Sequence, residues 1–250
     1  MKKQIFTVAL IGGDGAGKST VARRLLASFP QPIKYLYMGV NIESSNVALP
    51  TSRLIEKLKK VKRSGSDPGE TQAVSLHNAP KSKKSKSKVW VTIRLLNRVA
   101  EEWYRQFLSW RYRRQGNIVL YDRHFIFDYA KPANEPDSEY RRRPLNDRIH
   151  RWLLANFYPE PDLTVFLWAP PKILFKRKGE ATLAFLDGIQ RTFENKGKSV
   201  QHFVKIDTRQ PLKAVISEVI DVLMKFQSAR ESGETFYYEP VNVDEQLNTP

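Results

Sequence analysis

The residues best suited to chemistry stand near the N-terminus, in the octapeptide Gly12-Gly13-Asp14-Gly15-Ala16-Gly17-Lys18-Ser19. It fits the pattern G-x-x-x-x-G-K-[ST], in which glycines let a loop curl until successive backbone N–H groups point at phosphate oxygens. The lysine then reaches the β- and γ-phosphates of a nucleoside triphosphate, and the serine hydroxyl binds Mg²⁺. The alternative is an ordinary glycine turn that holds no ligand. We expect ATP and Mg²⁺ as cofactors, Lys18 as a catalytic residue, Ser19 as a metal ligand, and nucleotide contacts from Gly12, Gly13, Gly15, Ala16, Gly17, Lys18, Ser19 and Thr20.

Such a loop needs a strand before it and a helix after it, and the flanking sequence predicts both. Ile5–Ile11 is a short apolar run closed by glycines, which indicates a buried strand. Lys18–Ser28 carries Val21, Leu25 and Leu26 at helical spacing. The N-terminus of this helix would add its partial positive charge to the phosphate site.

Strands and helices alternate through the rest of the chain. Strands are predicted at Ile33–Met38, Asn117–Tyr121, Asp162–Trp168 and Gln201–Ile206, and helices at Ser52–Val61, Val89–Arg114, Leu145–Phe157, Pro171–Lys178 and Leu212–Phe226. This order is typical of βαβ units, so we predict a three-layer α/β/α P-loop kinase fold with a five-stranded parallel sheet over residues 1–228. Ligands bind such sheets beyond the carboxyl ends of the strands.

Asp122 and Arg123 follow the strand predicted at Asn117–Tyr121, where that edge of the sheet would meet the phosphate loop. A carboxylate there can hold Mg²⁺ or its water molecules, and a planar guanidinium can hold a phosphate group. The alternatives are a turn aspartate and a surface ion pair. We expect Asp122 to be a metal ligand and a catalytic residue, and Arg123 to be catalytic and substrate-binding.

Charge and composition narrow the class of protein. The formal net charge is +16, which suits polyanionic partners such as nucleotides. The absence of cysteine excludes disulfides, thiol catalysis and cysteine-ligated zinc, and it fits a reducing cytoplasm. No apolar run approaches the ~18 residues that span a bilayer. We therefore expect a cytoplasmic protein without a membrane span.

Two segments differ from the rest in composition. Residues 57–88 carry ten Lys/Arg and two acids, and residues 62–88 lack any helical or strand pattern, so we predict a basic, mobile insertion there. This insertion could give weak polyanion binding, although no aromatic residue between 57 and 88 offers a platform for stacking bases. Residues 229–250 carry one arginine and five acids, and we interpret them as an acidic tail that either packs or floats.

The motifs together resemble those of the thymidylate kinase family over about residues 5–227. The resemblance rests on Gly13–Thr20, on Tyr121-Asp122-Arg123-His124, on Pro161–Leu167 followed by Pro170-Pro171, and on Arg177-Lys178-Gly179-Glu180, which is similar to the start of that family's lid. It implies ATP-dependent phosphoryl transfer to a nucleoside monophosphate such as dTMP, and a lid over about residues 176–196. The family is often dimeric, so a homodimer is also implied; the aromatic residues of 89–114 could serve an interface or the core.

The resemblance further implies roles for four charged residues. Ala16 is not basic, so the lid must supply the catalytic cation, with Arg177 favoured over Lys176 and Lys178. Arg98, within Leu96-Asn97-Arg98, is the closest match to the arginine that holds the acceptor phosphate, and the alternative is an exposed basic stripe. Asp14 would touch the acceptor sugar or only brace the loop. Arg209 would stack on adenine or belong to an ordinary turn.

The resemblance fails after the second predicted strand. The family has an Arg-Glu-Pro-Gly-Gly segment there, whereas this chain has Met38–Pro50 without an arginine before Arg53. The acceptor could therefore be a nucleoside, a sugar or another small alcohol, for which Asp14, Glu43 or Asp122 could act as general base. A third hypothesis, motivated by the basic insertion, is a nucleic-acid-binding P-loop NTPase.

Overall fold

A single sheet of five parallel strands forms the centre of the molecule. The computed structural model describes residues 5–39, 88–133, 135–179 and 181–239. The strands β1 (Thr7–Ile11), β2 (Ile33–Tyr37), β3 (Ile118–Asp122), β4 (Leu163–Trp168) and β5 (Phe203–Asp207) lie in the order β2-β3-β1-β4-β5. All four pairings are parallel. The predicted five-stranded parallel sheet is confirmed.

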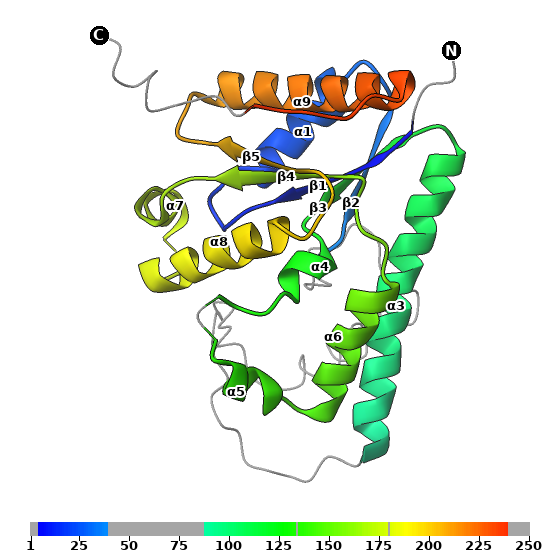
Figure 1. Ribbon diagram of the computed structural model, residues 1–250, viewed down its shortest axis with the longest axis vertical. Coiled ribbons are helices and arrows are strands. Elements are labelled where there is room, and N and C mark those ends of the chain that lie inside the picture. Colours follow the sequence, from blue (N-terminus) through cyan, green and yellow to red (C-terminus); the bar gives the residue numbers. More distant parts are fainter. Residues whose placement is uncertain (1–4, 40–87, 134, 180, 240–250) are drawn as a thin grey trace, which may run out of the picture.

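Helices cover both faces of this sheet, as predicted for a three-layer α/β/α fold (Figure 1). One face carries α1 (Lys18–Ser28) and α9 (Leu212–Ser232), which contact each other. The other face carries the helices α3 (Lys88–Arg114), α4 (Phe125–Asp128), α6 (Leu145–Phe157) and α8 (Leu183–Gly197). The shorter helices α5 (Asp137–Arg141) and α7 (Pro171–Lys178) lie at the periphery.

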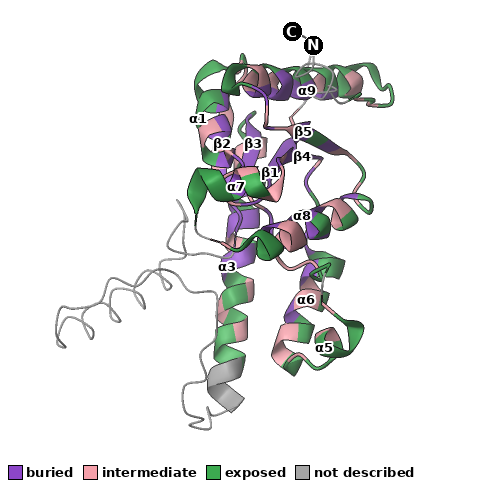
Figure 2. Ribbon diagram, turned by 90° about the vertical axis from the view of Figure 1, so that its left-hand side faces the viewer, coloured by how far each residue is buried: buried purple, intermediate pink, exposed green. Residues whose placement is uncertain are grey.

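The core has two layers because successive strand residues face opposite sides of the sheet. In β1, Val8 and Leu10 join the cluster beneath α1 and α9, whereas Ala9 and Ile11 join the cluster beneath α3, α4 and α8. All five residues of β1 and of β3 are buried, and both strands appear purple in Figure 2. Fully buried strands of this kind are typical of parallel sheets covered on both faces.

Most predicted elements are confirmed, and the differences lie mainly in the helices. The helices Lys18–Ser28, Leu145–Phe157 and Pro171–Lys178 form with the predicted bounds, while α8 and the short α4 and α5 were not predicted. The last helix runs to Ser232 instead of Phe226, and Phe236 and Tyr238 beyond it pack against the core. The predicted helix Ser52–Val61, the insertion up to residue 87 and the tail beyond residue 239 lie outside the described residues.

The long helix α3 presents its apolar residues outward. The outer stripe of α3 has side chains that are 36–63% exposed and are spaced three, four or seven residues apart: Ile93, Leu96, Trp103, Phe107 and Trp110. The buried face of the same helix is mostly polar, with Glu101, Glu102, Arg105, Gln106 and Ser109. The interior of this protein therefore does not account for the outer stripe. Within the described ranges, no helix is long and apolar enough to cross a membrane.

Candidate phosphate-binding site

The glycine-rich loop follows β1, the middle strand of the sheet, and leads into α1. Its backbone is left-handed at Gly15 (φ 86°) and Gly17 (φ 90°), a conformation that only glycine adopts without strain. A Cβ atom on Gly15 would lie 2.8 Å from the carbonyl oxygen of Leu174. Gly15 is therefore required both for the turn and for the close approach of α7.

Several backbone N–H groups of the loop have no acceptor within the described part of the chain. The amide of Ala16 donates to the Gly13 carbonyl at 3.2 Å, but the amides of Gly15, Gly17, Lys18 and Ser19 make no such bond. The N-cap residue of α1, Gly17, gives no side-chain cap, and the first turn contains no acid. The partial positive charge of this helix end is thus not offset by a capping side chain or by an acid in the first turn, which is the arrangement that suits a phosphate.

Lys18 is buried at the start of α1, with its ammonium group turned into the loop. Nζ donates to the carbonyl oxygens of Gly12 at 2.8 Å and Gly13 at 2.9 Å. Burial, together with the charge of Arg123, lowers the pKa of Lys18 to about 8, although nearby carboxylates oppose the shift. A lysine held at the loop by weak neutral acceptors can exchange them for phosphate oxygens, which are stronger partners.

Asp122 ends β3, the strand next to β1, so the sheet itself brings this carboxylate to the loop. The residue is buried, and its Oδ2 accepts a 2.8 Å hydrogen bond from the hydroxyl of Tyr35 on β2. Its charge also acts on Lys18. The tyrosine holds one carboxylate oxygen, which fixes the orientation of the group; the sequence analysis did not single out Tyr35.

Arg123 joins the end of β3 to the phosphate loop. Its backbone is left-handed (φ 66°), and its Nη2 donates to Oδ1 of Asp14 at 2.7 Å. Burial alone would lower the pKa of Arg123, but the carboxylates of Asp128 and Asp14 outweigh burial and raise it. Conversely, burial would raise the pKa of Asp14, and the charges of Arg123 and Lys18 lower it.

Asp128, at the end of α4, is a third carboxylate whose charge acts on this site, and no sequence motif marks it. Its effect on the pKa of Arg123 exceeds that of Asp14, and its charge also reaches Lys18. The short helix α4 that ends at Asp128 begins after His124. Nδ1 of His124 accepts a 3.4 Å hydrogen bond from the backbone amide of Ile126 and so caps this helix. Burial lowers the pKa of His124 to about 3, so the ring is neutral and Nδ1 is free to accept.

Arg177, the cation expected from the lid, lies beside the loop, but its guanidinium bonds to Thr208. A Cβ on Gly15 would meet the Cβ of Arg177 at 3.5 Å, yet Nη1 and Nη2 of Arg177 donate to Oγ1 and the carbonyl of Thr208 at 3.1 Å and 2.7 Å. The next residue, Lys178, contributes to the low pKa of Asp14. Two basic residues of the α7 end therefore act near the loop, and the guanidinium of one of them, Arg177, bonds to Thr208.

Arg209 and Arg98 interact with groups outside the phosphate loop. Nε and Nη2 of Arg209 bond Oδ2 of Asp207 at 2.8 Å and 2.7 Å, and its guanidinium lies 5.7 Å from the Trp168 ring. Arg98 is exposed on α3, and its charge acts on the hydroxyl of Tyr129.

The arginine of α3 nearest to the end of β2 is Arg105, not Arg98. Its side chain is only 1% exposed, its Nη1 donates to the Gly39 carbonyl at 2.7 Å, and Nη2 lies 3.4 Å from Glu101. The guanidinium also lies 5.5 Å from the Phe125 ring.

The donor set suits a magnesium nucleotide better than a metal held by protein alone. No group of three or more His, Asp or Glu side chains in residues 5–39, 88–133, 135–179 and 181–239 could hold a metal ion. Mg²⁺ is usually bound through one or two carboxylates together with substrate phosphates. Asp122, whose charge acts on Lys18, and Ser19, an exposed residue of the loop, could fill that role.

Comparison of the chain with protein-family models found no match, and neither did comparison with curated protein sequences.

Proposed function

We propose that the protein is an ATP-dependent phosphotransferase of the P-loop kinase type. The observation that carries this proposal is the glycine-rich loop after the central strand, with unbonded amides, a helix N-terminus without acids, and the buried Lys18 at its mouth. These are the groups that bind the β- and γ-phosphates of a nucleoside triphosphate. The resemblance to the thymidylate kinase family supports the same class of reaction.

In this mechanism the protein positions phosphates and stabilises charge. The loop amides and the N-terminus of α1 hold the triphosphate, and Lys18 moves from the Gly12 and Gly13 carbonyls to phosphate oxygens. A nucleophilic oxygen of the acceptor forms a bond to the γ-phosphorus as the bond to the ADP oxygen breaks. Fixed cations stabilise the charge that spreads over the transferring group. Arg123 is the best-placed cation, and Arg177 or Lys178 would join it when the α7 end turns toward the loop.

Mg²⁺ would be held by Ser19 and Asp122 and would supply positive charge at the β- and γ-phosphates. The hydroxyl of Tyr35 keeps the Asp122 carboxylate in one orientation. A residue that orients a metal ligand in this way tunes the metal site although it does not contact the ion.

The acceptor that the resemblance favours is a nucleoside monophosphate such as dTMP. Asp14 and Arg123 would contact it, since both lie beside the loop and are bonded to each other. A phosphate acceptor already carries an ionised oxygen, so this reaction needs no general base.

A second candidate acceptor is a small alcohol such as a sugar or a nucleoside. Asp128 favours it, because its negative charge acts on Arg123 and Lys18 and would oppose an acceptor phosphate, whereas the carboxylate could accept a hydroxyl proton. The proton would pass to Asp128 as the acceptor oxygen attacks the γ-phosphorus.

The proposal also covers the location and the assembly of the protein. A cytoplasmic location fits a chain without cysteine that acts on nucleotides. A homodimer fits the outer stripe of α3, because an exposed apolar stripe at helical spacing can pair with its own copy about a two-fold axis.

The experiment is ATP consumption by the purified chain against common nucleoside monophosphates, nucleosides and sugars, with Lys18→Ala as the inactive variant and Lys34→Ala as control. Lys34 is exposed on β2 and takes no part in the loop. Stimulation by one acceptor class, lost only in Lys18→Ala, supports the proposal. Equal rates for the two variants would contradict it.

A further inference from the structure

A cavity lies away from the phosphate loop, on the side of the sheet that α3, α4, α6 and α8 cover. Its volume is about 340 Å³, and its walls come from the end of α4, from α5, from α6 and from the C-terminal half of α8. No residue of Gly12–Thr20 lines it. The volume falls within the range of small-molecule sites, roughly 300–1,000 Å³.

The lining of this cavity is strongly biased toward anion recognition. It contains three cationic side chains and no carboxylate: Lys131, Arg151 and Lys196. Hydroxyl and amide groups alternate with them: Tyr129, Tyr140, Thr192, Asn195 and Ser199. The remaining wall is apolar, with Ile126, Ala130, Leu154 and Ala155. Such a mixture can hold a charged group together with a hydroxyl-bearing body.

The acids that pair with these cations stand outside the cavity. Arg151 bonds Oδ2 of Asp147 at 2.9 Å, and Lys196 lies 3.7 Å from Glu160. Lys131 pairs with Asp137. Because these acids do not line the cavity, they anchor the cationic side chains without filling the space that those side chains border.

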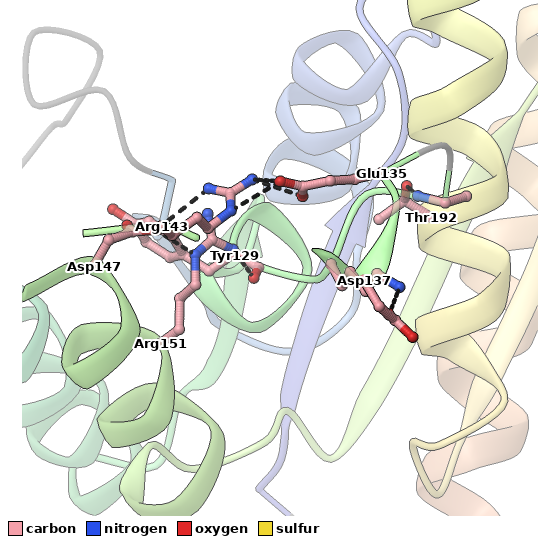
Figure 3. A network of polar contacts seen from close by, with 9 residues as sticks. Tyr129, Glu135, Asp137, Arg143, Asp147, Arg151 and Thr192 are labelled. Atoms are coloured by element: carbon pink, nitrogen blue, oxygen red, sulfur yellow. Dashed lines mark hydrogen bonds and ion pairs between the residues drawn. The ribbon is translucent and has the colours of Figure 1, made fainter. Parts of the chain in front are cut away.

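The walls are held in place before any ligand arrives. Figure 3 shows Arg143 and Arg151 reaching from the α6 side toward Glu135 and the main chain of Tyr129, with Thr192 of α8 opposite. Nη2 of Arg143 donates to both carboxylate oxygens of Glu135, at 2.7 Å to Oε2 and 2.9 Å to Oε1. A preformed site loses less conformational entropy on binding than one that must be assembled.

Two further contacts complete this frame. Arg151 Nη1 donates to the carbonyl of Tyr129, and its guanidinium lies 5.4 Å from the Tyr129 ring and 5.7 Å from the Tyr140 ring. The amide of Ala133 donates to Oγ1 of Thr192 at 2.8 Å, which ties the segment after α4 to α8. Both tyrosines are thereby fixed at the rim.

We propose that this cavity binds a small organic phosphate, a phosphate monoester on a hydroxyl-bearing body. Lys131, Arg151 and Lys196 surround the phosphate, and the tyrosine, threonine, serine and asparagine groups bond the hydroxyls. This site is distinct from the ATP site and does not depend on the proposed kinase activity. A sugar phosphate and a nucleoside monophosphate share the required chemistry.

The test is isothermal titration of the full chain with ribose 5-phosphate, with AMP, and with ribose as the ligand without phosphate. Lys196→Gln removes a lining cation, and Lys198→Gln is the matched control because Lys198 is exposed on the same helix end and does not line the cavity. We expect saturable binding of a phosphate monoester that Lys196→Gln weakens about tenfold or more, as for loss of a charged hydrogen bond, and that Lys198→Gln leaves unchanged. Tight binding of AMP but not ribose 5-phosphate assigns the site to nucleotides, and the reverse assigns it to sugar phosphates.

A Lys18→Ala variant separates this site from the phosphate loop. It should lose ATP binding and keep the affinity for the phosphate monoester, while Lys196→Gln should do the opposite; circular dichroism checks that each variant is folded. Three results would overturn the proposal: no saturable binding of either phosphate at millimolar concentration, loss of that binding in Lys18→Ala alone, or equal losses in Lys196→Gln and Lys198→Gln.

Discussion

Oδ1 of Asp14 in the phosphate loop accepts a 2.7 Å hydrogen bond from Nη2 of Arg123 at the end of β3. The two residues are 109 positions apart in the chain, and they meet because β1 and β3 are neighbours in the sheet. Asp14 and Arg123 are 40% and 33% exposed, so the pair contributes little to stability. Its effect is to hold the arginine beside the loop where phosphates would bind.

Replacing Asp14 with asparagine should lower phosphoryl-transfer turnover about tenfold or more. Without the Asp14 carboxylate, Arg123 would be displaced and would stabilise the charge on the transferring phosphoryl group less well. The melting temperature should change little, since exposed ion pairs contribute about 0–1 kcal/mol. Asp187→Asn is the control, because Asp187 pairs with Arg191 on the surface at 2.9 Å. Steady-state kinetics and thermal melts check both variants. Full turnover in Asp14→Asn would mean that Arg123 needs no such partner.

Nucleotide affinity should fall as pH rises above about 8. Burial lowers the pKa of Lys18 to about 8, and only the protonated ammonium attracts phosphate. A bound triphosphate favours the charged form, so binding near pH 8 should take up protons and binding near pH 6 should not. Titration of a non-hydrolysable ATP analogue in buffers of different ionisation enthalpy measures the uptake. Lys18→Arg stays charged throughout, and its affinity should be flat over the same range; a flat profile for the parent protein would contradict the assignment.

Gly15→Ala should abolish nucleotide binding, whereas Gly116→Ala should only lower stability. Both glycines have positive φ, at 86° and 83°, so both substitutions carry a backbone penalty of roughly 1–2 kcal/mol. Only at Gly15 would the new Cβ also meet a backbone oxygen at 2.8 Å; at Gly116 nothing lies within 4 Å. Titration calorimetry with ATP and urea unfolding separate the two effects. Equal ATP affinities would show that the loop tolerates displacement from Leu174.

Arg105→Met should destabilise the fold by about 3–5 kcal/mol, because it removes a partner of the buried Glu101 and the donor to the Gly39 carbonyl. Arg111→Met, an exposed arginine later in α3, should cost less than about 0.5 kcal/mol. Urea unfolding measures both. Similar midpoints for the two variants would mean that Arg105 is not a structural residue.

Phe107→Glu should convert a dimer into a monomer. Phe107 is 53% exposed within the outer stripe of α3, and a buried unpaired carboxylate there would oppose association. Met224→Glu is the control, since Met224 is 51% exposed on α9, on the opposite face of the sheet. Sedimentation velocity gives the mass of each variant. A monomeric parent protein at all concentrations would remove the basis for the dimer.

Secondary structure was predictable from the sequence wherever apolar residues recur clearly with a period of two or 3.6 residues. It predicted the five strands, and it predicted the helices Lys18–Ser28 and Leu145–Phe157 with their observed bounds. Helix α8 was not predicted although Leu186, Gln190 and Phe193 have helical spacing, since residues 176–196 were expected only to form a lid.

The site was predictable where a motif or a strand end marks it, as at Lys18 and Asp122. Tyr35 and Asp128 carry no motif, and only the pairing of β2 with β3 and the capping of α4 bring them to the site. Arg98 stays a prediction for the acceptor phosphate, whereas the burial of Arg105 was not predictable, because sequence spacing cannot tell the buried face of α3 from the exposed one. That helix reverses the usual rule, with polar residues inside and the outer stripe exposed.

The most direct test of the central claim is transfer of a labelled γ-phosphoryl group from ATP to dTMP or to an alcohol acceptor, with Asp128→Asn beside the parent protein and Lys18→Ala. We predict a labelled product from dTMP that is lost in Lys18→Ala and keeps most of its rate in Asp128→Asn. A rate loss of about 10²–10⁴-fold in Asp128→Asn with unchanged ATP affinity would assign the acceptor to the hydroxyl class. Label found in no acceptor, or in the same amount with Lys18→Ala, would contradict the kinase assignment.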